Sequence, residues 1–145
     1  MQLKVEQDLD LEDIHVLIRY AARDQQLRRL LTVIKGLGEK IEAHDETGNV
    51  LLSITDIFYF ESVDKRTFAY CSTDVYQVSD RLYQIKEKLS RYGFVQVSKT
   101  CVLNSHVLQS VRKVHNSRME AQLSNGERVI VSRKYVPELQ AALKR

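Results

Sequence analysis

The sequence predicts a mainly β fold that contains a short helix and follows a small α+β unit. In the last hundred residues, short segments alternate apolar and polar side chains, which is typical of half-buried strands. Turn-forming residues separate these segments, and Asn125-Gly126 is the strongest hairpin signal among them. Residues 79–92 instead place Leu82, Ile85 and Leu89 at helical spacing.

The first 45 residues predict a β-β-α-β unit. Residues 3–5 and 14–18 alternate as two short strands. Asp24 can cap a helix whose leucines share one face, and Gly36 and Gly38 end it. A unit of this size buries little surface alone, so we expect it to pack on the rest of the chain or on a second copy.

Charge divides the chain into two predicted units, residues 1–45 and residues 46–145. The first has nine acidic and seven basic residues, a net charge of −2, whereas the second has ten acidic and fifteen basic residues, a net charge of +5. The junction, residues 45–49, is a turn-like run between two apolar stretches. The change of sign suggests that the units have different roles.

The second unit is predicted to be mostly strands. Ser79 is the expected N-cap of its helix, Gly93 the expected C-terminal stop, and Pro137 opens a last short helix. Strands are expected at residues 57–60, 68–70, 75–78, 95–97, 102–103, 107–114, 119–123 and 129–131.

Positive charge is concentrated in residues 91–145. This segment has ten Lys and Arg but three acidic residues, a net of +7 against +3 for the whole chain. Such a surface suits a polyanion such as DNA, although a solvated basic face would give the same count.

The sequence gives little support for catalysis, so we expect no enzyme activity, cofactor or metal. Its four histidines lack metal-ligand spacing, and no nucleophile or phosphate-loop motif is present. No apolar run could span a membrane, and the N-terminus lacks the apolar core of a signal peptide. Cys71 and Cys101 have no CxxC companion, which suits reduced thiols in a cytoplasmic protein.

Three polar breaks at strand ends are the candidate nucleic-acid contacts. Each combines cations, for phosphates or guanine edges, with hydroxyl groups or a turn. The breaks are Lys65-Arg66, Ser98-Lys99-Thr100 and Ser132-Arg133-Lys134-Tyr135. The helix at residues 79–92 also carries four cations, but no second helix stands at helix-turn-helix spacing beside it.

Four segments follow one another in a characteristic order. They are Asp56-Ile57-Phe58-Tyr59-Phe60-Glu61, Arg91-Tyr92-Gly93-Phe94, Val97-Ser98-Lys99-Thr100-Cys101-Val102-Leu103-Asn104 and Val129-Ile130-Val131-Ser132-Arg133-Lys134-Tyr135. As a set they are specific, and the chain resembles the LytTR DNA-binding domain of bacterial transcription regulators over residues 47–145.

The resemblance implies an almost all-β fold of small antiparallel sheets. It also implies contact with promoter DNA through loops in successive major grooves, usually as two copies on direct repeats. The recognition loops fall on Lys65, Arg66 and Thr67, on Ser98, Lys99 and Thr100, and on Arg133 and Lys134. The family often has His-Arg-Ser where this chain has Ser98-Lys99-Thr100, so the base read there is expected to differ. The chain resembles family members without a receiver domain.

Two other functions stay open at this stage. A β-domain that docks an acidic partner protein, with the first unit as a dimerisation surface, fits the same charge distribution. RNA binding by an aromatic β-surface is less favoured, because no exposed aromatic pair with glycine spacing is evident. Tyr59 and Phe60 are expected in the core, and Asn104 is expected to hold a turn.

Overall fold

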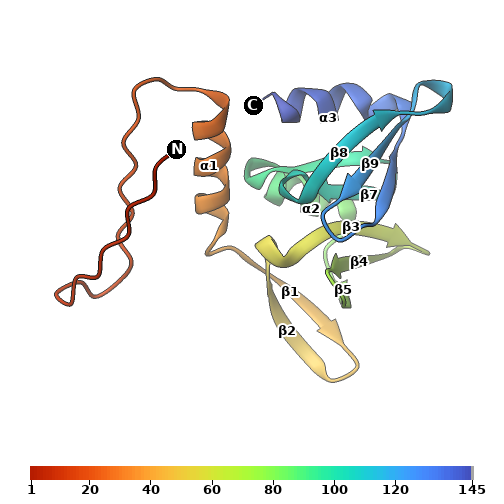
Figure 1. The fold of residues 1–145 in the computed structure, drawn as a ribbon. Coiled ribbons are helices and arrows are strands. Elements are labelled where there is room, and N and C mark those ends of the chain that lie inside the picture. Colours follow the sequence, from red (N-terminus) through yellow and green to blue (C-terminus); the bar gives the residue numbers. More distant parts are fainter. Residues whose placement is uncertain (145) are drawn as a thin grey trace.

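A computed structural model of the protein, in which residues 1–144 are described, contains two antiparallel sheets (Figure 1). The larger sheet has seven strands in the order β2-β1-β5-β4-β3-β7-β6, and the smaller has three in the order β10-β9-β8. The large sheet comprises β1 (Lys40–Asp45), β2 (Gly48–Ser53), β3 (Ile57–Val63), β4 (Arg66–Cys71), β5 (Val75–Val78), β6 (Phe94–Ser98) and β7 (Cys101–Asn104). The small sheet comprises β8 (Leu108–Lys113), β9 (Met119–Leu123) and β10 (Arg128–Val131). The predicted mainly β fold class is confirmed.

Three α-helices accompany the sheets: α1 (Gln25–Gly36), α2 (Leu82–Leu89) and α3 (Val136–Leu143). Asp24 caps α1 as predicted, because its carboxylate accepts a hydrogen bond from the Leu27 backbone N–H at 2.9 Å. Pro137 lies in the first turn of α3, also as predicted. Within residues 1–144, no helix has the length and apolar character that crossing a bilayer requires.

Both faces of the large sheet are covered, and each has its own core. One core joins Phe60 and Val102 of the sheet to Ile85 and Leu89 of α2. The other joins Leu103 and its neighbours to the small sheet and to α3. Because successive strand residues point to opposite faces, Val102 and Leu103 belong to different cores although both are fully buried.

The predicted strands at residues 3–5 and 14–18 are not formed. Residues 1–24 have no regular secondary structure apart from a turn at residues 9–10, and they join neither sheet. An alternating pattern forms a strand only where a neighbour satisfies its backbone, and neither stretch has such a hydrogen-bonded neighbour strand. Figure 1 shows this part of the chain at the left, away from the sheets.

The division expected between residues 45 and 46 falls in the turn of a hairpin. β1 pairs with β2 along its whole length and with β5 on its other side, so it belongs to the large sheet. The charge difference therefore does not mark a structural boundary at that point. The turn predicted at residues 45–49 is present, but it joins β1 to β2 within one sheet instead of joining two units.

The α2 helix begins later than predicted. Ser79 is not its N-cap: Arg81 takes that position, and the Gln84 side chain accepts a hydrogen bond from the Arg81 N–H at 2.8 Å. Residues 90–92 continue as a 3₁₀ turn, and Gly93 ends the segment with φ 93°. The Asn125-Gly126 hairpin forms as predicted, with Gly126 rather than Asn125 at positive φ.

Substituting Gly93 is expected to destabilise the fold. At φ 93° an L side chain is strained, and a Cβ there would lie 2.6 Å from Nε2 of His106. We expect Gly93→Ala to lower the free energy of unfolding by roughly 1–3 kcal/mol in urea denaturation. Gly38→Ala is the control, because no atom lies within 4 Å of its Cβ position, and it should stay within about 0.5 kcal/mol of the wild type. Equal losses in both variants would contradict this explanation.

Candidate nucleic-acid interface

Backbone hydrogen bonds bring the three predicted contact loops to one edge of the protein. The Ser62 N–H at the end of β3 donates to the Thr100 carbonyl at 2.8 Å. The Ser132 N–H, just after β10, donates to the Val97 carbonyl at 2.9 Å. The β3–β4 turn, the β6–β7 turn and the segment after β10 are therefore neighbours, on a side of the molecule opposite residues 1–24 (Figure 1).

The β3–β4 turn presents two adjacent cations. Asp64 and Lys65 have φ values of 51° and 66°, the left-handed pair that closes a tight two-residue hairpin. Lys65 and Arg66 are exposed at its tip. Thr67 is different: it is 5% exposed and pairs with Val78 inside the sheet. We therefore correct the prediction for Thr67, whose side chain faces the core and not the edge.

Polar side chains brace the β6–β7 turn. Ser98 Oγ accepts a hydrogen bond from the Thr100 N–H at 3.2 Å, and the Gln96 side chain donates to the Ser98 carbonyl at 3.0 Å. Lys86 of α2 in turn donates to Gln96 at 3.1 Å. The hydroxyl of Ser98 therefore accepts a hydrogen bond within the turn, and Lys99 and Thr100 are its exposed side chains.

The segment after β10 carries the remaining predicted contacts. Residues 133–135 form a single 3₁₀ turn that leads into α3. Arg133 and Lys134 are exposed, whereas Tyr135 is half-buried against the core that includes α3. The Lys134 ammonium lies 5.8 Å from the centre of the Tyr135 ring, within cation–π range.

The five exposed cations of this edge form no ion pair within the described part of the protein, and they gather where the three loops meet. The ion pairs found within residues 1–144 involve Lys4, Lys86, Lys88, Arg112 and Arg128. Across that same range, Lys65, Arg66, Lys99, Arg133 and Lys134 have no acidic side chain within 4.0 Å. Their charge is thus available to an external anion. We call these five residues the cationic edge.

A fourth loop lies beside the cationic edge, and the sequence reasoning did not assign it. Lys113 and Val131 both pair with Met119, so the β8–β9 loop extends from the same end of the small sheet as Arg133. The exposed Lys113 and Arg118 flank it. β8 confirms the strand predicted at residues 107–114, whereas the tight loop after it has positive φ at Asn116 and Ser117, for which the sequence pattern gave no signal.

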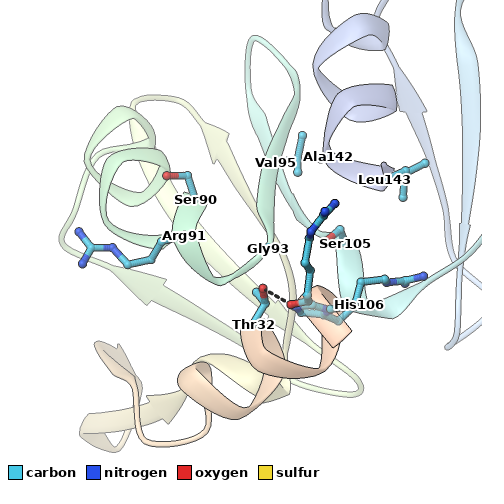
Figure 2. Close-up of a pocket in the computed structure, with 11 residues that line it drawn as sticks. Thr32, Ser90, Arg91, Gly93, Val95, Ser105, His106, Ala142 and Leu143 are labelled. Carbon is cyan, nitrogen blue, oxygen red and sulfur yellow. Dashed lines mark hydrogen bonds between the residues drawn. The ribbon is translucent and has the colours of Figure 1, made fainter. Parts of the chain in front are cut away.

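The histidine nearest a cavity has a structural role away from the cationic edge. A cavity of about 160 Å³ lies beside α1, lined by Thr32, Gly93 and His106 among others (Figure 2). Burial lowers the pKa of His106, and the nearby Arg29 lowers it further. The neutral ring contacts the Tyr92 carbonyl, with Nε2 at 3.1 Å. The labelled Arg91 side chain points away from the cavity in Figure 2.

The thiols and the aromatic residues serve the fold. Both cysteines are free, and burial raises the pKa of Cys101 to about 12 and that of Cys71 to about 11, which disfavours the reactive thiolate. Tyr59 stacks on Tyr70 at 4.5 Å, while Phe60 is fully buried. In the described part of the chain, no group of His, Cys, Asp and Glu side chains could hold a metal ion.

The architecture defines a β-type domain that gathers cation-bearing loops along one edge. Residues 47–144 match the family described as LytTr DNA-binding domain, and the chain belongs to that family. The resemblance inferred from the sequence is confirmed. A solved LytTr DNA-binding domain from Bacillus cereus has the same fold, with a TM-score of 0.69 over 73% of this chain and 97% of that chain, at 19% identity.

Relatives with curated descriptions include regulatory proteins. The sensory transduction protein LytT of Bacillus cereus is 26% identical over 90% of this chain and 55% of its own length. An uncharacterized HTH-type transcriptional regulator of Staphylococcus aureus is 19% identical over 77% of this chain and 79% of its own length. The chain thus spans about half the length of the LytT proteins it matches.

Proposed function

We propose that the protein is a cytoplasmic transcription regulator that binds promoter DNA in a sequence-specific manner. The observation that carries this proposal is the convergence of three loops with unpaired cations on one edge of a rigid sheet scaffold. Family membership and the transcriptional regulator among its relatives support it. The cationic edge would enter successive major grooves, and two copies would occupy direct repeats.

The two kinds of side chain on the edge suit different parts of DNA. Arg133 offers a bidentate fork that matches O6 and N7 of guanine in the major groove. Lys65 and Lys99 are point charges suited to phosphates, which fix register. The competing function, docking of an acidic partner protein, would use the same charges without such geometric discrimination.

Salt is expected to weaken DNA binding steeply. If Arg133 reads a guanine and the other four cations of the cationic edge each neutralise a phosphate, the slope of log affinity against log salt should be about −3 to −4 per bound copy. Lys99→Ala should reduce that slope by roughly 1, measured by fluorescence anisotropy on the upstream region of the protein's own gene. Lys88→Ala is the control. Lys88 lies on α2, outside the cationic edge, and its ammonium is already paired with the Asp80 carboxylate at 2.9 Å. The same change in both variants would contradict the assigned edge.

A further inference from the structure

Residues 1–24 form an apolar arm with no partner in this chain. The arm is two irregular segments joined by a turn in which the Asp10 N–H donates to the Asp8 carboxylate at 3.0 Å. Its large apolar side chains are solvent-exposed: Leu3 86%, Val5 82%, Leu9 87%, Ile14 88%, Val16 57% and Leu17 77%. Contiguous exposure of this kind marks an interaction site, whereas scattered single residues do not.

The α1 helix next to the arm is only partly covered. Leu27 is buried, but Leu30, Leu31 and Ile34 are half-buried, and Leu37 is 59% exposed. The Gln25 side chain ties the start of α1 to the Leu143 carbonyl at the end of α3. The helix is thus anchored to the domain while part of its apolar face stays open.

We propose that the arm is a dimerisation element. The arms of two copies pair as antiparallel strands, and their apolar side chains cover both α1 helices. This explains why the sequence alternates as two strands that a single chain does not form. In Figure 1 the arm lies on the side opposite the cationic edge, so the proposed dimer leaves that edge free for DNA.

Strand chemistry favours a second copy as the occupant. A lone two-stranded hairpin is marginal in water, and one folded on its own α1 would leave both strand edges open. Pairing with an identical arm covers one edge of each through a two-fold symmetric contact. Domains on direct repeats are related by translation, so this two-fold symmetry is confined to the arms. With roughly 60–120 Å² for each of the six apolar side chains, the arm offers about 360–720 Å² per copy, and the open face of α1 adds to it toward the ~800 Å² of a standard interface.

Charge also matches the arm to α1. Residues 4–13 contain one base, Lys4, and five acids: Glu6, Asp8, Asp10, Glu12 and Asp13. The α1 region carries Arg23, Arg28, Arg29 and Lys35 against one acid, Asp24. Within residues 1–144, none of these four cations forms an ion pair. If the arm lies across the α1 helix of a second copy, its carboxylates can form ion pairs with these four cations.

Light scattering on the full chain tests the proposal. The wild type should have twice the 16.8 kDa mass of one chain at micromolar concentration without DNA. Val5→Asp/Ile14→Asp places two charges on the apolar face of the arm and should weaken dimerisation by at least ~100-fold, giving a monomer. Gln2→Asp/His15→Asp introduces the same residues on the polar face and should remain a dimer.

Each other result overturns the proposal. A wild-type monomer with exchange-protected amides in residues 1–20 would show that the arm folds on its own chain. A monomer with unprotected amides would show a free arm, and a dimer that survives Val5→Asp/Ile14→Asp would place the contact elsewhere. Binding to DNA with a single site is measured in parallel. The monomeric variant should keep wild-type affinity there, so loss of DNA binding by every form would count against the proposed function and not against the arm.

Discussion

Replacing Arg133 with alanine should weaken the discrimination between promoter DNA and random DNA. A bidentate contact from arginine to guanine contributes about 1–3 kcal/mol, so we expect specific affinity to fall roughly 5- to 150-fold. Affinity for random duplex should change far less, because it depends on phosphate contacts. A gel shift with the upstream fragment of the gene and a scrambled fragment of equal length measures both affinities.

Two further variants separate base recognition from charge. Arg133→Lys keeps the positive charge but loses the planar fork, so it should resemble Arg133→Ala on the specific fragment. Arg128 lies at the other end of β10, where its guanidinium is 3.7 Å from the Glu120 carboxylate. The variant Arg128→Ala should therefore leave DNA binding unchanged. If Arg133→Lys kept wild-type affinity for the specific fragment, Arg133 would contact a phosphate and not a guanine. Unchanged binding by Arg133→Ala would remove it from the interface.

Strand signals were reliable where turn chemistry framed them. The Asn125-Gly126 turn and the Asp64-Lys65 turn each join two strands that pair as neighbours, so the local pattern contained the whole hairpin. The sequence could not show which strands pair across a distance. β3 lies between β4 and β7, and this placement is what brings Lys99 next to the β3–β4 turn. Only the family resemblance predicted that Lys99 and the β3–β4 turn would act together.

Thr67 shows how a sheet that is covered on both faces misleads sequence reasoning. The family resemblance placed Thr67 in a recognition loop together with Lys65 and Arg66. Both faces are in fact packed, and the smaller Thr67 and Ala69 are the buried pair. Alternation identifies faces only when one of them meets water. The arm is the opposite case, because its alternation is clear and its partner strand is absent from the chain.

Replacing Asn104 with alanine should destabilise the scaffold without altering how DNA is read. Asn104 is 2% exposed: its amide donates to the Ile57 carbonyl at 2.9 Å and its oxygen accepts from the His106 N–H at 3.0 Å. These bonds join β7 to the start of β3, so the residue holds a turn as the sequence predicted. Alanine would leave the Ile57 carbonyl and the His106 N–H without these hydrogen-bond partners. We therefore expect the free energy of unfolding to fall by roughly 2–4 kcal/mol in urea denaturation.

A second asparagine, Asn125, serves as a control that shows whether burial causes the loss of stability in Asn104→Ala. Asn125 also accepts a backbone hydrogen bond, from the Glu127 N–H at 3.0 Å, but in an exposed turn where water can replace it. Asn125→Ala should therefore lose less than about 1 kcal/mol. Below its unfolding transition, Asn104→Ala should bind promoter DNA with wild-type affinity per folded molecule. If it instead kept its stability and lost affinity for the promoter, Asn104 would be a DNA-reading residue, and the corner that follows β7 would belong to the DNA interface.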